Sequence, residues 1–236
     1  MKSWTYGAAA PIAILVGLCL VGCEGERRII DTFGDSLPAD GLDLLDVSVE
    51  TGNLTVAGDP DATAVDVQVD IATTRTSDKK DSDATHAVHL ELRESTGGAA
   101  LLTVWFDPDY DRYYADTTVT LPIDMAINGI VEDGDVVIDG AGALTLDAGA
   151  GEADLSDLIG DVEVVDTAGD LSLVGVAGNV LIDDGAGDLT VQEVDGNLEI
   201  DDGAGDISVS KVSGDVVIRD TKGEITIDDV GSVTIE

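Results

Sequence analysis

Gly187-Asp188-Leu189-Thr190-Val191-Gln192-Glu193-Val194-Asp195 is one unit of a tandem repeat that decides the fold. Glycine recurs every nine residues, at positions 142, 151, 160, 169, 178, 187, 196, 205, 214 and 223. In each unit, two apolar residues two positions apart are typical of a short strand with one buried face, and the flanking Gly and Asp favour turns. The pattern therefore predicts many short strands joined by tight turns.

The eighth position of the unit shows that the true period is eighteen. It alternates between an apolar class (Leu158, Val176, Val194, Val212, Val230) and a class of threonine and glycine (Thr167, Gly185, Gly203, Thr221). When the sequence is aligned at this period, similar residues fall at equivalent positions, which we call a column. One example is the column Leu171, Leu189, Ile207 and Ile225. Successive coils of a parallel β-solenoid stack equivalent side chains about 4.8 Å apart. We therefore predict an all-β protein: a parallel β-solenoid with about 18 residues per coil.

The alternative architecture is an antiparallel meander of nine-residue strand-and-turn units. Its apolar face would need a covering layer, and the sequence shows no helical segment to supply one, whereas a coil encloses that face itself. No aromatic residue follows Tyr114, and the stacked positions are nearly all Val, Ile or Leu. We therefore favour the solenoid and expect a narrow interior.

The chain is strongly acidic. Its 236 residues include 49 Asp and Glu against 11 Lys and Arg, for a formal net charge of −38. This balance argues against nucleic acid or anionic lipid headgroups as partners. It favours cations, basic partners or a saline habitat.

The N-terminus has the pattern of an export signal. After Lys2, an apolar run extends from Tyr6 to Gly22, which is short for a transmembrane span and ends in a small residue before Cys23. The segment Leu20-Val21-Gly22-Cys23 resembles the lipobox of a bacterial lipoprotein signal. The resemblance implies that Cys23 becomes the lipidated first residue of an exported protein anchored to a membrane of the cell envelope. The alternative is an ordinary signal anchor with an incidental cysteine.

The composition divides the chain into four segments. Residues 1–22 are the predicted lipoprotein signal peptide, and the polar residues 23–43 are expected to be a flexible tether. Longer strands over 44–128 predict an N-terminal capping β subdomain, because an open terminal coil is an unpaired edge. Residues 129–236 carry the solenoid repeats. No cap is visible after them, so we expect the last coil to be closed by its own charges or by end-to-end self-association.

Several segments together resemble a known family. They are the strands around Val47–Val56, the Thr118-Val119-Thr120-Leu121-Pro122 step and the serial Gly-Ala-Gly-Asp-Leu-Thr-Val units. Over about residues 44–236 they are similar to the bacterial β-strand-repeat family named putative adhesin, a domain of unknown function. The resemblance implies the β-repeat fold and a binding role at the cell surface, and it brings no catalytic residues.

Aspartates form columns at the period of eighteen and are the candidate metal ligands. One column contains Asp184, Asp202 and Asp220, and another contains Asp188 and Asp206. Like charges at this spacing repel by about 1 kcal/mol per pair even in water. Ca²⁺, bulk salt, or side-chain bonds to turn N–H groups would relieve the repulsion. The turns resemble the calcium β-roll nonapeptide but lack one of its aspartates, so solvated turn carboxylates are the alternative. No other cofactor is expected.

Aromatic residues cluster around one turn and form a candidate ligand-binding platform. Trp105, Phe106, Tyr110, Tyr113 and Tyr114 lie within ten residues, and strand alternation sends Trp105 and Phe106 to opposite faces. One face would suit a surface glycan or a protein partner. The alternative is packing against the first coil.

The repeat gives no sign of an active site. Its turns are three to five residues long without insertions, which leaves no lined cleft, and no carboxylate stands out in an apolar setting that would raise its pKa. We therefore expect a protein that is not an enzyme, with a binding, adhesion or structural role. The alternatives are a Ca²⁺-responsive acidic module and, third, a glycan-active enzyme on a β-helical scaffold.

Overall fold

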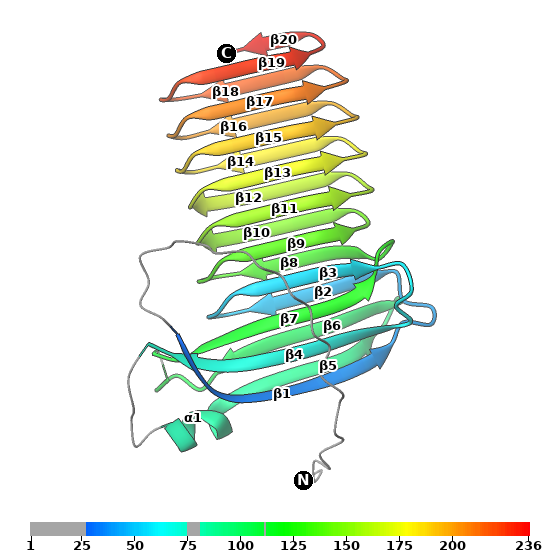
Figure 1. Ribbon diagram of the computed structural model, residues 1–236, viewed down its shortest axis with the longest axis vertical. Helices are drawn as coiled ribbons and strands as arrows, with labels where there is room; N and C mark the ends of the chain where they lie inside the picture. Colours follow the sequence, from blue (N-terminus) through cyan, green and yellow to red (C-terminus); the bar gives the residue numbers. More distant parts are fainter. Residues whose placement is uncertain (1–26, 75–80, 111) are drawn as a thin grey trace.

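The chain is nearly all β and is built from two ten-stranded sheets (Figure 1). The computed structural model describes residues 27–74, 81–110 and 112–236. Sheet A consists, in spatial order, of β1 (Arg28–Pro38), β4 (Ala64–Thr73), β7 (Tyr114–Pro122), β3 (Leu54–Asp59), β9 (Val136–Ala141), β11 (Ala153–Leu158), β13 (Leu171–Val176), β15 (Leu189–Val194), β17 (Ile207–Val212) and β19 (Ile225–Val230). Sheet B consists of β20 (Val233–Ile235), β18 (Val216–Asp220), β16 (Leu198–Asp202), β14 (Val180–Asp184), β12 (Val162–Ala168), β10 (Leu144–Ala150), β8 (Ala126–Val131), β2 (Leu44–Val49), β6 (Ala99–Phe106) and β5 (Val88–Ser95). The short helix α1 (Asp81–Ala87) lies between β4 and β5 in sequence.

From β8 onwards the chain winds as the predicted parallel β-solenoid. Each coil places one strand in sheet B and the next in sheet A, and every strand pairs in parallel with its equivalents in the neighbouring coils. Leu189 pairs with Ile207, and Leu198 pairs with Val216, so the register is eighteen residues. The fold prediction is therefore confirmed, with about six coils of this kind.

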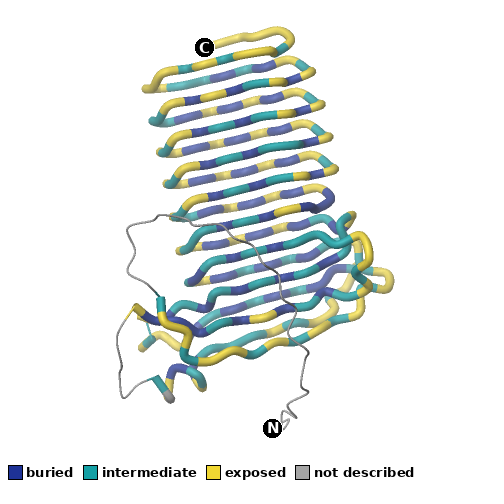
Figure 2. The backbone as a smooth tube through the Cα atoms, in the orientation of Figure 1, coloured by how far each residue is buried: buried dark blue, intermediate teal, exposed yellow. Residues whose placement is uncertain are grey.

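The narrow interior is filled by columns of aliphatic side chains. Along the strands of the inner coils buried residues alternate with more exposed ones, so dark blue segments alternate with yellow or teal ones in the middle of the stack in Figure 2. In β15 the buried residues Val191 and Val194 are three apart, which strict alternation would not allow. Glu193, between them, has φ 60° and is skipped in the strand pairing. This left-handed residue turns Val194 back into the core without changing the register between the coils.

The recurring glycines are explained by how closely successive turns stack. A Cβ on Gly187 would lie well inside van der Waals contact with the carbonyl oxygen of Gly169 in the preceding coil, and Gly205 meets Gly187 in the same way. A larger residue here would force the two turns apart. The period of nine therefore reflects two such turns in each coil.

The N-terminal end differs from the prediction. β1 pairs along its whole length with β4, so the prediction of a flexible tether over residues 23–43 is wrong for residues 28–38. Residues 44–128, expected to cap the solenoid, are continuous with it: β2 and β3 form a coil between β6–β7 and β8–β9. The antiparallel strands β1, β4 and β5 cover this end of the stack. Backbone pairing to a neighbouring strand, rather than its own composition, makes β1 a strand.

The other end of the stack is less covered. Val233 and Ile235 of β20 are exposed, and Ile225 and Ile227 of β19 are only partly buried. Equivalent residues in the inner coils are buried because a further coil packs on them. The end-to-end self-association expected for this coil stays a prediction.

Candidate binding faces and the buried aspartate ladder

The predicted metal ligands Asp188 and Asp206 are exposed and cap the turn of the next coil. Oδ1 of Asp188 accepts a hydrogen bond from the amide of Asp206 (3.0 Å), and Oδ1 of Asp206 accepts one from the amide of Glu224 (3.0 Å). Asp170 does the same for the amide of Asp188 (2.9 Å). These bonds offset the repulsion within the column, which is one of the alternatives that the sequence leaves open. Calcium binding by the two residues stays a prediction.

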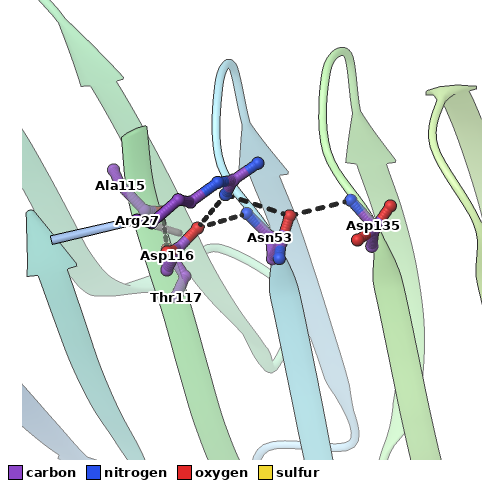
Figure 3. A network of polar contacts seen from close by, with 6 residues as sticks. All are labelled: Arg27, Asn53, Ala115, Asp116, Thr117 and Asp135. Carbon is purple, nitrogen blue, oxygen red and sulfur yellow. Dashed lines mark hydrogen bonds and ion pairs between the residues drawn. The ribbon is translucent and has the colours of Figure 1, made fainter. Parts of the chain in front are cut away.

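Caps of the same kind recur at the N-terminal end of the stack, where they end at Arg27 (Figure 3). Oδ1 of Asn53 accepts a hydrogen bond from the amide of Asp135 (3.0 Å), and Oδ1 of Asp116 accepts one from the amide of Asn53 (2.9 Å). The Arg27 guanidinium donates to Asp116 (2.7 Å) and to Asn53 (3.3 Å), and it lies 4.0 Å above the ring centroid of Tyr114. Arg27 therefore fastens the N-terminal segment to the first coils.

A second aspartate column lies inside the solenoid. Asp166, Asp184 and Asp202 occupy the same position in β12, β14 and β16, pair in register, and are each no more than 2% exposed. Neither carboxylate oxygen of Asp166 or Asp184 has a hydrogen-bond partner, and Oδ2 of Asp202 also lacks one. Oδ1 of Asp202 accepts a bond from the amide of Ala204 (3.1 Å). We call Asp166, Asp184 and Asp202 the buried aspartate ladder.

Burial raises the pKa values of the carboxyl groups in the buried aspartate ladder. Desolvation raises the pKa of Asp166 to about 6, and the nearby amides of Ala168 and Thr167 counteract part of this shift without reaching full hydrogen-bond geometry. The pKa of Asp184 rises to about 7, because desolvation is reinforced by the carboxylates of Asp166 and Asp202 on either side. Burial also raises the pKa of Asp202. The expectation that no carboxylate lies in an apolar setting is therefore wrong.

The ladder only partly matches the predicted metal column. Asp184 and Asp202 belong to it, but Asp220 is partly exposed and accepts a hydrogen bond from the amide of Lys222 (2.6 Å). The predicted column did not include Asp166, although this residue lies eighteen positions before Asp184. Within the described part of the chain, no group of three or more His, Cys, Asp or Glu side chains is arranged to hold a metal ion. Calcium binding at the ladder also stays a prediction.

The aromatic cluster is divided among three places. Trp105 lies on the outer face of sheet B and stacks on His89 at a centroid distance of 4.9 Å. Tyr113 is buried at the N-terminal end, where Tyr110 packs on its ring at 5.9 Å. Tyr114 lies under Arg27. The four predicted ligand-binding residues therefore do not form one platform, and binding by any of them stays a prediction.

The two outer faces of the solenoid differ in chemistry. Two columns of outward residues run along sheet B from β8 to β18: Asn128, Thr145, Glu163, Leu181, Glu199 and Val217, and beside them Ile130, Asp147, Val165, Asp183, Asp201 and Arg219. The outer face of sheet A carries mainly hydroxyl groups in β13 to β19, including Ser172, Thr190, Ser208 and Thr226 in one column. We call the two columns from β8 to β18 the B face.

The B face is hollowed and partly apolar. Ile130, Val165 and Leu181 are 41% to 44% exposed. A shallow hollow that includes Leu181 is lined by side chains from β12, β14, β16 and β18. Among the described residues of β9 to β19 in sheet A, no large apolar side chain is as exposed. The two faces can therefore be compared directly by mutation.

The predicted membrane anchor lies outside these faces. Cys23 lies outside the described residues, so its lipidation stays a prediction. Among the described helices, none has the length and apolar character needed to cross a bilayer.

Comparison with known proteins finds only distant structural likenesses. No family model and no curated protein matches the chain. A putative adhesin from Bacteroides fragilis is 16% identical with a TM-score of 0.42, and the match covers 87% of this chain and 97% of that chain. For a putative adhesin from Parabacteroides merdae the values are 11%, 0.39, 87% and 95%. For a putative lipid binding protein from Parabacteroides distasonis they are 14%, 0.33, 87% and 96%.

Proposed function

We propose that this chain is a lipid-anchored, non-enzymatic binding element of a bacterial cell envelope. The observation that supports a binding role is the pair of continuous outer faces on a solenoid whose turns are short. The hollow on the B face is shallow, and the carboxylates with raised pKa values lie in the sealed core rather than in a cleft. An extended face with a closed interior suits contact with a partner better than catalysis.

The anchor part of the proposal rests on the lipobox-like segment that ends at Cys23. Arg27 follows only four residues later and is bonded to Asp116 and Asn53. A fully extended chain of four residues reaches at most roughly 14 Å. A lipid on Cys23 would therefore hold the N-terminal coils close to the bilayer surface rather than at the end of a long tether.

Membrane fractionation of the full-length chain tests the anchor. We expect Cys23→Ser to release or misprocess the protein, because the acyl chains are its only proposed attachment. Cys19→Ser is the matched control and should fractionate as the wild type, since Cys19 would leave with the signal peptide. Unchanged membrane association of Cys23→Ser would sink the proposal of a lipid anchor.

A second candidate function is a Ca²⁺-responsive acidic module. It is favoured by one observation, the five buried carboxylate oxygens of the aspartate ladder that have no hydrogen-bond partner. Buried carboxylate oxygens rarely lack a partner, and a bound Ca²⁺ would satisfy these oxygens.

Thermal unfolding in chelator, in millimolar Ca²⁺ and in molar NaCl separates the explanations. A rise in the midpoint with Ca²⁺ alone, lost in Asp184→Asn, would support metal binding by the ladder. A midpoint that responds only to molar salt would assign the acidity to a saline habitat and remove the Ca²⁺ candidate.

A further inference from the structure

Among the described residues, no cation neutralises the carboxylates of Asp183 and Asp201 on the B face. Asp183 and Asp201 are neighbours on adjacent strands, and among the described residues neither makes an ion pair or a side-chain hydrogen bond. Arg219 follows Asp201 in the column, but its guanidinium binds Glu199 (2.6 Å) and Glu236 (3.0 Å) instead. Equal charges at the spacing of adjacent strands are destabilising, so the face would gain from an external cation.

The apolar residues of the B face lie among these charges. Leu181 is flanked in its column by Glu163 and Glu199, and Val165 precedes Asp183 in the other column. Val165 and Leu181 lie on adjacent strands of one face, at diagonal positions roughly 7 Å apart. Acidic and apolar side chains are therefore interspersed across the hollow.

The mixture of carboxylates and apolar side chains on the B face favours one class of partner over others. A nucleic acid or an anionic lipid surface would be repelled by the carboxylates, since the sequence from 113 to 210 contains no lysine or arginine. A glycan platform needs exposed aromatic rings, and the sequence has none after Tyr114. A polypeptide with interspersed basic and apolar side chains would neutralise the charges and cover the exposed aliphatic groups.

We propose that the B face docks a basic, amphipathic polypeptide segment of a partner protein, with the exposed side chains around Leu181 as its apolar contact and Asp183 and Asp201 as its charge contacts. The inference rests on the proposed binding function and names the chemistry of its partner. Apolar contact at the centre would provide stability, and the carboxylates would attract the partner and fix its position.

The test is binding of a labelled peptide of alternating lysine and leucine to the full-length chain, measured by fluorescence anisotropy. Two control peptides replace the lysines by glutamate or the leucines by serine. We expect only the first peptide to bind well, with an affinity that falls as salt concentration rises.

Matched variants locate the site on the protein. Asp183→Asn with Asp201→Asn should weaken binding about tenfold and flatten its salt dependence, because two exposed charge contacts are removed. Leu181→Ser should weaken it about fivefold through loss of apolar contact. Asp154→Asn with Asp228→Asn removes the same charge from the outer face of sheet A and should change affinity by less than about twofold. Circular dichroism checks that each variant is folded.

The outcomes are separable from those of the anchor test. If the charge-removing pairs on the two faces weaken binding equally, attraction to the whole acidic protein explains it and the B face is not the site. If the serine-containing peptide binds as well as the leucine peptide, or no peptide binds, the inference is overturned. Either result leaves the fractionation of Cys23→Ser as an independent measure of the proposed anchoring.

Discussion

Replacing Asp184 by asparagine should stabilise the protein, and the gain should grow with pH. The folded-state pKa of Asp184 is about 7, against 3.8 for an unperturbed aspartate. Between these two values the folded chain holds a proton that the unfolded chain has released, so the stability due to this group falls as pH rises. The asparagine amide is neutral at every pH and can donate to the carboxylates of Asp166 or Asp202. The variant therefore removes the cost of ionising a buried group.

The magnitude follows from the size of the pKa shift. At 1.36 kcal/mol per pKa unit, a shift of about 3 units corresponds to about 4 kcal/mol at pH 8, where Asp184 is ionised in both states. At pH 5 only the unfolded state is ionised, and the cost is about 1.5 kcal/mol. The difference is an upper value, because Asp184 shares its shift with two neighbouring carboxylates. We expect the gain in Asp184→Asn to be at least about 1 kcal/mol larger at pH 8 than at pH 5.

Urea unfolding followed by circular dichroism at pH 5 and pH 8 measures this gain. Asp183→Asn is the matched control, because it removes one charge from the adjacent residue, which faces the solvent. It relieves only the repulsion with Asp201 on the neighbouring strand, so it should stabilise the chain by less than about 1 kcal/mol and by the same amount at both pH values. An equal gain for Asp184→Asn at both pH values, or the same pH dependence in the control, would refute the assignment of a buried, protonated carboxyl group.

Two further predictions test the stacking of the coils and the attachment of the N-terminal segment. Gly187→Ala should lower the free energy of unfolding by at least about 3 kcal/mol, because its methyl group meets the backbone of the preceding turn. Gly41→Ala meets no atom within 4 Å and should cost only about 1 kcal/mol, from its φ of +80°; equal losses in urea unfolding would contradict the close approach. Arg27→Ala should speed amide hydrogen exchange in β1 about tenfold by removing a partly buried ion pair. Arg93→Ala, which removes an exposed pair, should leave that exchange unchanged, and equal rates in both variants would exclude the fastening role of Arg27.

The coils could be predicted because each carries the same local signals. Glycine at each close turn and aliphatic residues at each inward position recur with one period. The pairing register between successive coils can therefore be derived from the sequence. The strand β1 carries no such signal, since it contains Gly34, Asp35 and Pro38 and is mostly exposed. It is ordered by pairing with β4, a partner more than twenty-five residues away. Long-range pairing of this kind cannot be recognised from local composition.

The candidate site was partly predictable. Alternation along β14 places Asp184 on the same face as Val180 and Ile182, so the sequence holds the signal that this carboxylate points inward while Asp183 points outward. Alternation likewise separates Trp105 from Phe106, and the structure confirms this. The left-handed conformation of Glu193 and the position of Tyr113 depend on the path of the backbone, which the side-chain pattern does not determine.

The distance between two spin labels on sheet A tests the stacked-coil architecture most directly. Asp154 and Thr226 lie in one column, four coils apart, through the pairs of β11, β13, β15, β17 and β19. Cysteines at these positions, in a chain without Cys19 and Cys23, can be labelled and measured by pulsed electron paramagnetic resonance. Stacked coils predict a backbone separation of about 19 Å, from four steps of about 4.8 Å. An antiparallel meander would place eight strand spacings between the labels, about 38 Å, and that result would contradict the solenoid and the two faces derived from it.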